Sequence, residues 1–136
     1  MASMKPFNVA IEIKEPKTGM AQAVLNELAD KLQEFADSGK QHVIDISSLP
    51  LTHSDKQELE TLLGQGEVKI TLSTIGESRV IETAYSGIWW IKHFTVDDKL
   101  ISELIEITRI PEIIKSQPDD VKLAATDIKA RINSNI

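Results

Sequence analysis

The sequence predicts an α+β fold in which a four-stranded antiparallel meander packs with three or four helices. Apolar residues recur at spacings of three, four and seven near both ends of the chain, as in amphipathic helices. Much of residues 68–107 instead alternates with the period of two that is typical of strands. Segregated helical and strand patterns favour α+β over alternating α/β proteins. With 136 residues and no repeat or low-complexity linker, residues 1–136 are expected to form a single domain.

Three elements are predicted before residue 47. Alternating apolar and polar residues over Phe7–Ile13 indicate a strand with one buried face. The β-branched run His42–Ile46 predicts a second, short strand. Between them, a helix is expected to begin at Met20 and to end near Ser38 and Gly39, with an apolar stripe at Val24, Leu25, Leu28, Leu32, Phe35 and Ala36.

A brief second helix is expected to begin at Thr52 or Ser54, whose hydroxyls suit an N-cap, and to end at Gly64. Asp55 lies in its first turn, where the helix dipole favours a carboxylate. The Gly-Gln-Gly sequence at its end is not interpreted as a phosphate loop, because such loops lead from a strand into a helix and here a helix leads into a strand. Gly64 is expected to cap the helix, and Gly66 to permit a close approach of the backbone.

The meander is predicted from four apolar runs separated by turn residues. Val68, Ile70 and Leu72 share one face of its first strand, and the other three strands are expected over Arg79–Tyr85, Ile88–Thr95 and Leu100–Ile107. The last of these runs also fits a helix, and strand is the interpretation adopted.

Two prolines predict the C-terminal helices, because proline suits the first turn of a helix. Pro111 is expected to begin a short helix, and Pro118 a longer one in which Asp119 and Asp120 complement the dipole. The apolar stripe of this last helix is expected to be Val121, Ala124, Ala125, Ile128 and Ile132.

Composition excludes several classes of function. A formal net charge of -6 argues against sequence-independent binding to nucleic acid, which needs clustered Lys and Arg. The absence of cysteine excludes disulfides and metal sites held by the chain's own thiolates. We expect a cytoplasmic protein that does not insert into membranes, because the sequence shows neither a signal peptide nor a run of apolar residues long enough to span a bilayer.

No catalytic residue, metal site or cofactor is predicted. His42, His53 and His93 lack the i, i+4 pairing and the neighbouring carboxylates of metal motifs. Glu67, Glu82 and Glu103 would suit acid–base chemistry if the fold brought them together, but solvated strand faces paired with Lys69 and Arg79 explain the carboxylates equally well.

The adjacent Trp89 and Trp90 form the most informative local pattern, because neighbouring residues on a strand point to opposite faces of the sheet. An exposed Trp on the face away from the core would favour contact with a partner, since Trp is enriched in binding hot spots. The alternatives are that both indoles are buried under elements on two faces, or that the outer one packs in a homodimer.

Several short sequences, in one register, resemble the HupH family of hydrogenase expression and formation proteins, also called HyaF or HoxQ. The resemblance is clearest over residues 43–118. It rests on Ser48-Leu49-Pro50-Leu51-Thr52, Asp55-Lys56-Gln57-Glu58-Leu59, Leu63-Gly64-Gln65-Gly66-Glu67-Val68, Glu82-Thr83-Ala84, Gly87-Ile88-Trp89 and Ile110-Pro111-Glu112.

This resemblance implies a non-catalytic accessory protein, or chaperone, for nickel-iron hydrogenase. Its expected partner is the iron-sulfur small subunit precursor, or another maturation factor such as a rubredoxin-like protein. The expected contact residues are Trp89, Trp90, Tyr85, Glu67 and Glu82. Two alternatives stay open: a small ligand-binding or enzymatic domain that uses clustered carboxylates and His93, and a self-associating module.

Overall fold

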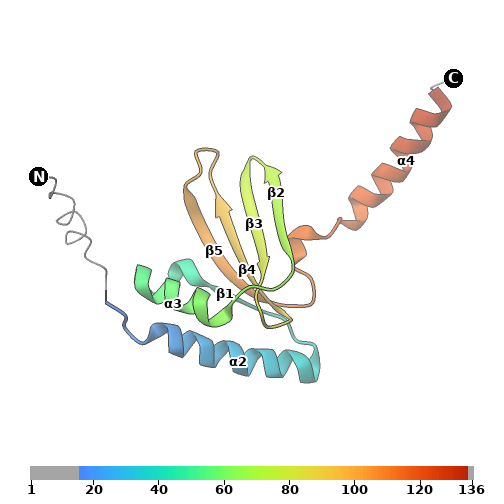
Figure 1. Cartoon of the computed structure of the whole chain (residues 1–136). Coiled ribbons are helices and arrows are strands. Elements are labelled where there is room, and N and C mark those ends of the chain that lie inside the picture. The colour runs from blue at the N-terminus through green and yellow to red at the C-terminus, as the bar shows by residue number, and fades with distance from the viewer. Residues whose placement is uncertain (1–15, 135–136) are drawn as a thin grey trace, which may run out of the picture.

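A computed structural model describes residues 16–134, in which an antiparallel sheet packs against helices (Figure 1). The sheet has five strands in the order β1-β5-β4-β3-β2. Their bounds are β1 His42–Asp45, β2 Lys69–Thr74, β3 Gly76–Glu82, β4 Ile88–Phe94 and β5 Leu100–Ile107. The α+β class and the meander from β2 to β5 are confirmed, and the predicted short strand β1 adds a fifth strand. The strand predicted over Phe7–Ile13 lies outside the described residues.

The helices begin and end close to the predicted residues. They are α2 Met20–Ser38, α3 His53–Leu63 and α4 Pro118–Ser134, with two 3₁₀ helices, η1 Ile46–Ser48 and η2 Glu112–Ile114. Gly39 ends α2 with a φ of 79°, in the left-handed region that glycine tolerates best, and its N–H donates to the carbonyl of Phe35 at 2.8 Å. Across residues 16–134, none of these helices has both the length and the apolarity required to cross a bilayer.

One face of the sheet packs against α2 and α3 and forms the larger core, and we call it the α face. Its buried strand residues are Ile44, Ile88, Trp90, Ile105 and Ile107, and the helices contribute Ala21, Val24, Leu28, Leu59 and Leu63. These side chains combine the period of two of the strands with the helical period of α2 and α3. The core therefore lies between the sheet and two helices that come from the first half of the chain.

The opposite face carries a smaller core beneath η2, and we call it the η2 face. Val80, Trp89 and Ile91 are buried there, with Ile70, Leu104 and Ile114 packed around them. Ile114 belongs to η2, so the helix predicted at Pro111 is a short 3₁₀ helix that covers this face. β5 lies between β1 and β4: residues 104–107 pair with both neighbouring strands, and the first half of β5 pairs with β4, which confirms the choice of strand over helix.

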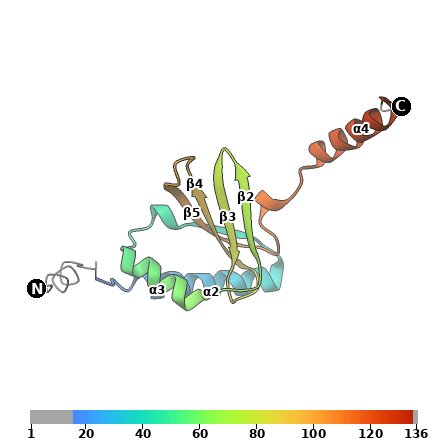
Figure 2. The ribbon, with the colours of Figure 1, turned by 45° about the horizontal axis from the view of Figure 1, so that its top comes forward.

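The predicted C-terminal helix is present, but its apolar stripe does not join either core. All of the α4 residues Pro118–Ser134 are exposed. Two views show α4 running away from the sheet and from the other helices (Figures 1 and 2). The expectation that the helices cover the sheet therefore holds for α2 and α3, and fails for α4.

A buried carboxylate joins α3 to the segment that precedes α2. Asp55 is fully buried, and its carboxylate accepts hydrogen bonds from Thr18 N at 2.8 Å, Thr18 Oγ1 at 2.6 Å and Thr52 N at 3.0 Å. Thr52, one of the two residues predicted as the N-cap, accepts in return from Asp55 N at 3.0 Å, which completes a capping box. The bonds from Thr18, followed by those from Thr52, lower the pKa of Asp55 from 3.8 to about 2.

This capping network predicts a pH-dependent loss of stability. Because folding lowers the pKa of Asp55, its contribution is fully present above pH 3.8 and is lost as the pH falls towards 2. Asp55→Asn should lower the melting temperature at neutral pH by roughly 3–6 °C. The difference from the unaltered chain should shrink between about pH 4 and pH 2.

The difference in melting temperature is measured by thermal unfolding, monitored by circular dichroism, across that pH range. Asp30→Asn, at an exposed position of α2, is the matched control and should leave the melting temperature close to that of the unaltered chain. A difference between Asp55→Asn and the unaltered chain that stays constant down to pH 2 would contradict the role given to the Asp55 carboxylate.

Candidate functional site

Both tryptophans are buried, on opposite faces of β4. Trp90 is 4% exposed within the α face, and Trp89 is 6% exposed under η2. Trp89 Nε1 donates to the carbonyl of Thr108 at 3.1 Å, and Trp90 Nε1 donates to Glu103 Oε2 at 2.9 Å. Of the alternatives weighed for this pair, the structure has burial on both faces. We therefore assign both indoles to the core and not to a contact surface.

Glu103 is a buried structural carboxylate beneath Trp90. It is 2% exposed, and its second oxygen, Oε1, lies 2.8 Å from Lys56 Nζ. Ser47 fixes the backbone at the same point, because Glu103 N donates to Ser47 Oγ at 2.7 Å. Each carboxylate oxygen thus has a partner, which is what a charge at the boundary between helix and sheet requires.

The three glutamates considered for acid–base chemistry do not converge. Glu103 lies on the α face, whereas Glu82 pairs in register with Trp89 on the η2 face. Glu67 lies in the exposed loop that leads into β2. Since the sheet separates Glu103 from Glu82, the pair cannot act together on one substrate.

Glu82 fastens the loop between α3 and β2. Its Oε1 accepts from Glu67 N at 3.1 Å, and its backbone carbonyl accepts from Gly66 N at 2.8 Å. A Cβ at Gly66 would lie 2.6 Å from Glu82 Oε1 and 2.5 Å from the carbonyl oxygen of Thr83, so only glycine fits this close approach. Gly64 caps α3, with its N–H donating to Glu60 O at 2.9 Å. Both glycines have the structural roles predicted for them.

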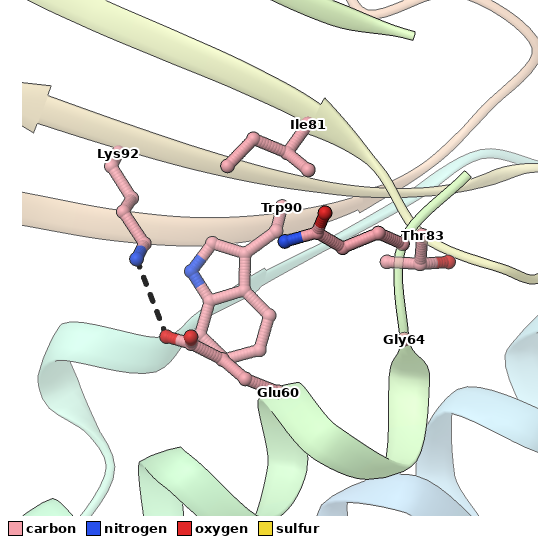
Figure 3. Close-up of a pocket in the computed structure, with 7 residues that line it drawn as sticks. Glu60, Gly64, Ile81, Thr83, Trp90 and Lys92 are labelled. Atoms are coloured by element: carbon pink, nitrogen blue, oxygen red, sulfur yellow. Dashed lines mark hydrogen bonds and ion pairs between the residues drawn. The ribbon is translucent and has the colours of Figure 1, made fainter. Parts of the chain in front are cut away.

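A small pocket beside Trp90 lies between the end of α3 and the strands β3 and β4 (Figure 3). The ion pair between Lys92 and Glu60, with Nζ 3.3 Å from Oε1, crosses its side. Its volume of about 40 Å³ holds a water molecule or two, and an organic ligand needs several hundred. We do not assign a substrate to this pocket.

Two of the histidines, His42 and His93, have ordinary structural neighbours. His42 Nε2 lies 3.1 Å from Glu34 Oε1, and His93 Nδ1 lies 2.7 Å from Ser78 Oγ. Within residues 16–134, no three His, Asp or Glu side chains are grouped so that they could hold a metal ion.

Tyr85 is the predicted contact residue whose ring offers accessible surface. It is 51% exposed in the turn between β3 and β4, where its backbone N–H donates to Thr83 Oγ1 at 3.2 Å and its carbonyl accepts from Ile88 N at 3.1 Å. Gly87, with a φ of 95°, completes the turn. The backbone that carries the ring is thus held in place without any bond from the Tyr85 hydroxyl.

An apolar groove of about 220 Å³ lies beside this ring, and we call it the Tyr85 groove. It is lined by Leu25, Leu28, Ala29 and Leu32 of α2, Leu63 of α3, and Tyr85 and Ile88. Sequence reasoning selected Tyr85 but missed the groove. The leucines of α2 were assigned to the core, and the helical pattern alone does not show which of them stay partly accessible after α3 and the turn have packed.

Comparison with known proteins gives a consistent set of relatives. Residues 19–134 match the model described as HupH hydrogenase expression protein, C-terminal conserved region. The chain is 32% identical over 111 residues to hydrogenase expression/formation protein HupQ of Azotobacter chroococcum mcd 1, with 80% of this chain and 39% of that protein covered. It is 31% identical over 83 residues to hydrogenase-1 operon protein HyaF of Escherichia coli, with 59% and 28% covered.

A solved structure shares the fold. Hydrogenase expression protein HupH from Thiobacillus denitrificans aligns with a TM-score of 0.83 and 36% sequence identity, covering 87% of this chain and 98% of that one. The chain spans about 39% of the length of the curated relatives HupQ and HoxQ of Azotobacter.

The ion pair between Lys56 and the buried carboxylate of Glu103 yields a prediction about stability. Lys56→Met should lower the free energy of unfolding by about 2 kcal/mol, because it leaves the Glu103 carboxylate buried without its cation. Adding Glu103→Gln removes the charge and keeps an acceptor for Trp90 Nε1, so the double variant should recover about half of the loss.

Urea unfolding of the unaltered chain, of Lys56→Met, of Glu103→Gln and of the double variant measures these free energies of unfolding. Lys40→Met, at a well-exposed lysine, is the control and should change the free energy of unfolding by less than about 0.5 kcal/mol. A double variant less stable than Lys56→Met alone would show that the lysine does not stabilise the carboxylate.

Proposed function

Because the chain belongs to the HupH family of hydrogenase expression proteins, matching their C-terminal conserved region over residues 19–134, we propose that it is an accessory protein in nickel-iron hydrogenase maturation. In this proposal it acts in the cytoplasm as a chaperone that binds the precursor of the iron-sulfur small subunit. Another maturation factor, such as a rubredoxin-like protein, is the alternative partner.

The Tyr85 groove is the observation that carries this proposal. A tyrosine that is 51% exposed beside an apolar groove combines a rigid aromatic surface with a recess that a partner's apolar side chain can fill. The groove lies between two helices and a turn whose backbone is fixed by Thr83. A partner would therefore meet a preformed surface, and binding would cost little conformational entropy.

A non-catalytic role is part of the proposal. Three observations on residues 16–134 support it: the separation of Glu82 from Glu103 by the sheet, the ion-paired state of Glu103, and the small volume of the pocket beside Trp90. The alternative of an enzymatic domain needs a cleft in which clustered carboxylates face His93. His93 bonds to Ser78 and interacts electrostatically with Glu106 on the η2 face, but none of Glu67, Glu82 and Glu103 pairs in register with it. The arrangement favours a binding protein over that alternative.

Co-purification from cells that make a nickel-iron hydrogenase tests the proposed function. The tagged chain should retain the small subunit precursor, and Tyr85→Ala should reduce the recovered precursor roughly tenfold, as expected for the loss of an aromatic hot spot. Tyr85 is suitable because its backbone bonds survive the change, whereas Trp90→Ala would open a cavity in the core.

Ile101→Ala is the matched control, since Ile101 is 62% exposed on β5 and lies outside the groove. It should leave the recovered precursor unchanged. Recovery of no hydrogenase component by the unaltered chain would refute the proposed role. Equal recovery by Tyr85→Ala and the unaltered chain would refute the groove as the binding surface and leave the role in maturation standing.

A further inference from the structure

The helix α4 presents an unpaired apolar seam. Val121, Ala125, Ile128 and Ile132 follow one another at spacings of four, three and four, the repeat that aligns side chains along one line of a helix. We call these four residues the α4 stripe. Val121 is 54% exposed, Ile128 61% and Ile132 65%. Three large aliphatic side chains on one line of a helix thus face solvent.

A helix with such an exposed apolar stripe is expected to pack against another surface. An isolated helix of this length is marginal in water, because most helical stability in proteins comes from the packing of an apolar face. The match to the family's conserved region runs to residue 134 and so includes α4, which makes the helix part of the family's shared structure. The cover must come from a surface that the isolated chain does not place against the stripe.

The structure does not place the sheet of the same copy against the stripe. Only residues 115–117 link η2 to α4, and both views show the helix directed away from the sheet (Figures 1 and 2). Pairing of α4 with α4 of another copy is disfavoured in the antiparallel arrangement. There, Lys122 and Lys129 on one border of the stripe would face the same lysines of the partner helix.

The η2 face of the sheet has the complementary chemistry. Beside η2 it keeps Ile70, Leu72 and Leu104 partly exposed, and the register places Asp45, Glu82 and Glu106 on the same side. Among the described strand residues whose side chains lie on this face, none is a lysine or arginine, and Lys115, which follows η2 beside Glu106, is ion-paired with Glu112. An apolar surface bordered by carboxylates fits an apolar stripe bordered by Lys122 and Lys129.

We propose that α4 of one copy binds through the α4 stripe to the η2 face of a second copy, and that the second copy returns its own α4 in the same way. The exchange is a closed two-fold arrangement, in which each helix–sheet contact occurs twice. The partner is a second copy of this chain, so the inference does not depend on the hydrogenase component bound at the Tyr85 groove.

Molar mass in solution gives the first test. Light scattering on the full chain should yield about twice 15.1 kDa. Ile128→Asp should raise the dimer dissociation constant at least about tenfold, because it places a charge in the apolar contact. The matched control is Leu123→Asp, since Leu123 is 60% exposed on the opposite side of α4 and should leave the dimer intact. A monomer at every concentration, or equal loss with both variants, overturns the proposal.

Crosslinking gives the second test, because the chain has no cysteine of its own. A chain with Ile128→Cys is mixed and equilibrated with a chain carrying Leu72→Cys, and a short bismaleimide should join the two. Leu123→Cys mixed with Leu72→Cys should give little product.

Two other products would overturn the proposal. Crosslinking of Ile128→Cys to itself would show that two α4 helices pair with each other. A monomeric chain carrying both changes that crosslinks internally would show that α4 folds back on its own sheet.

Discussion

Two adjacent tryptophans on one interior strand oblige this protein to cover both faces of its sheet. Trp89 and Trp90 must point in opposite directions, and an indole left in water on either side would be a large apolar surface. The two faces of the sheet are covered to different extents. Two full helices cover Trp90, while the short helix η2 covers Trp89. The architecture around β4 follows from this requirement.

Burial of the Trp90 ring also dictates the polar chemistry nearby. A buried indole N–H needs an acceptor, which Glu103 supplies, and a buried carboxylate needs a cation, which Lys56 supplies from α3. A side chain with the attributes of a catalytic acid, buried and beside an aromatic ring, is thus explained by packing. Apolar area available to a partner lies instead at the surface, on Tyr85 and the α4 stripe.

Local patterns in the sequence predicted most of the elements and little of their assembly. The bounds of β5 and the beginnings of α2 and α4 follow from periodicity and from proline or glycine positions, whereas the hydroxyls near the start of α3 left two candidates for its cap, Thr52 and Ser54, of which the structure has Thr52. The bonds from Thr18 to Asp55 span 37 residues, and no local pattern signals them. The Tyr85 groove and the exposure of α4 likewise depend on how distant elements meet, which periodicity does not encode.

The short helix η2 connects the apolar cluster around Trp89 to the C-terminal helix α4. Ile114 packs in the cluster that contains Trp89, and only residues 115–117 separate it from α4. Movement of α4 is therefore expected to displace η2 and to change the surroundings of Trp89. Since both indoles of the protein are buried, a shift in intrinsic fluorescence would register movement at η2. Intrinsic tryptophan fluorescence can therefore report on movement of α4 without an added label.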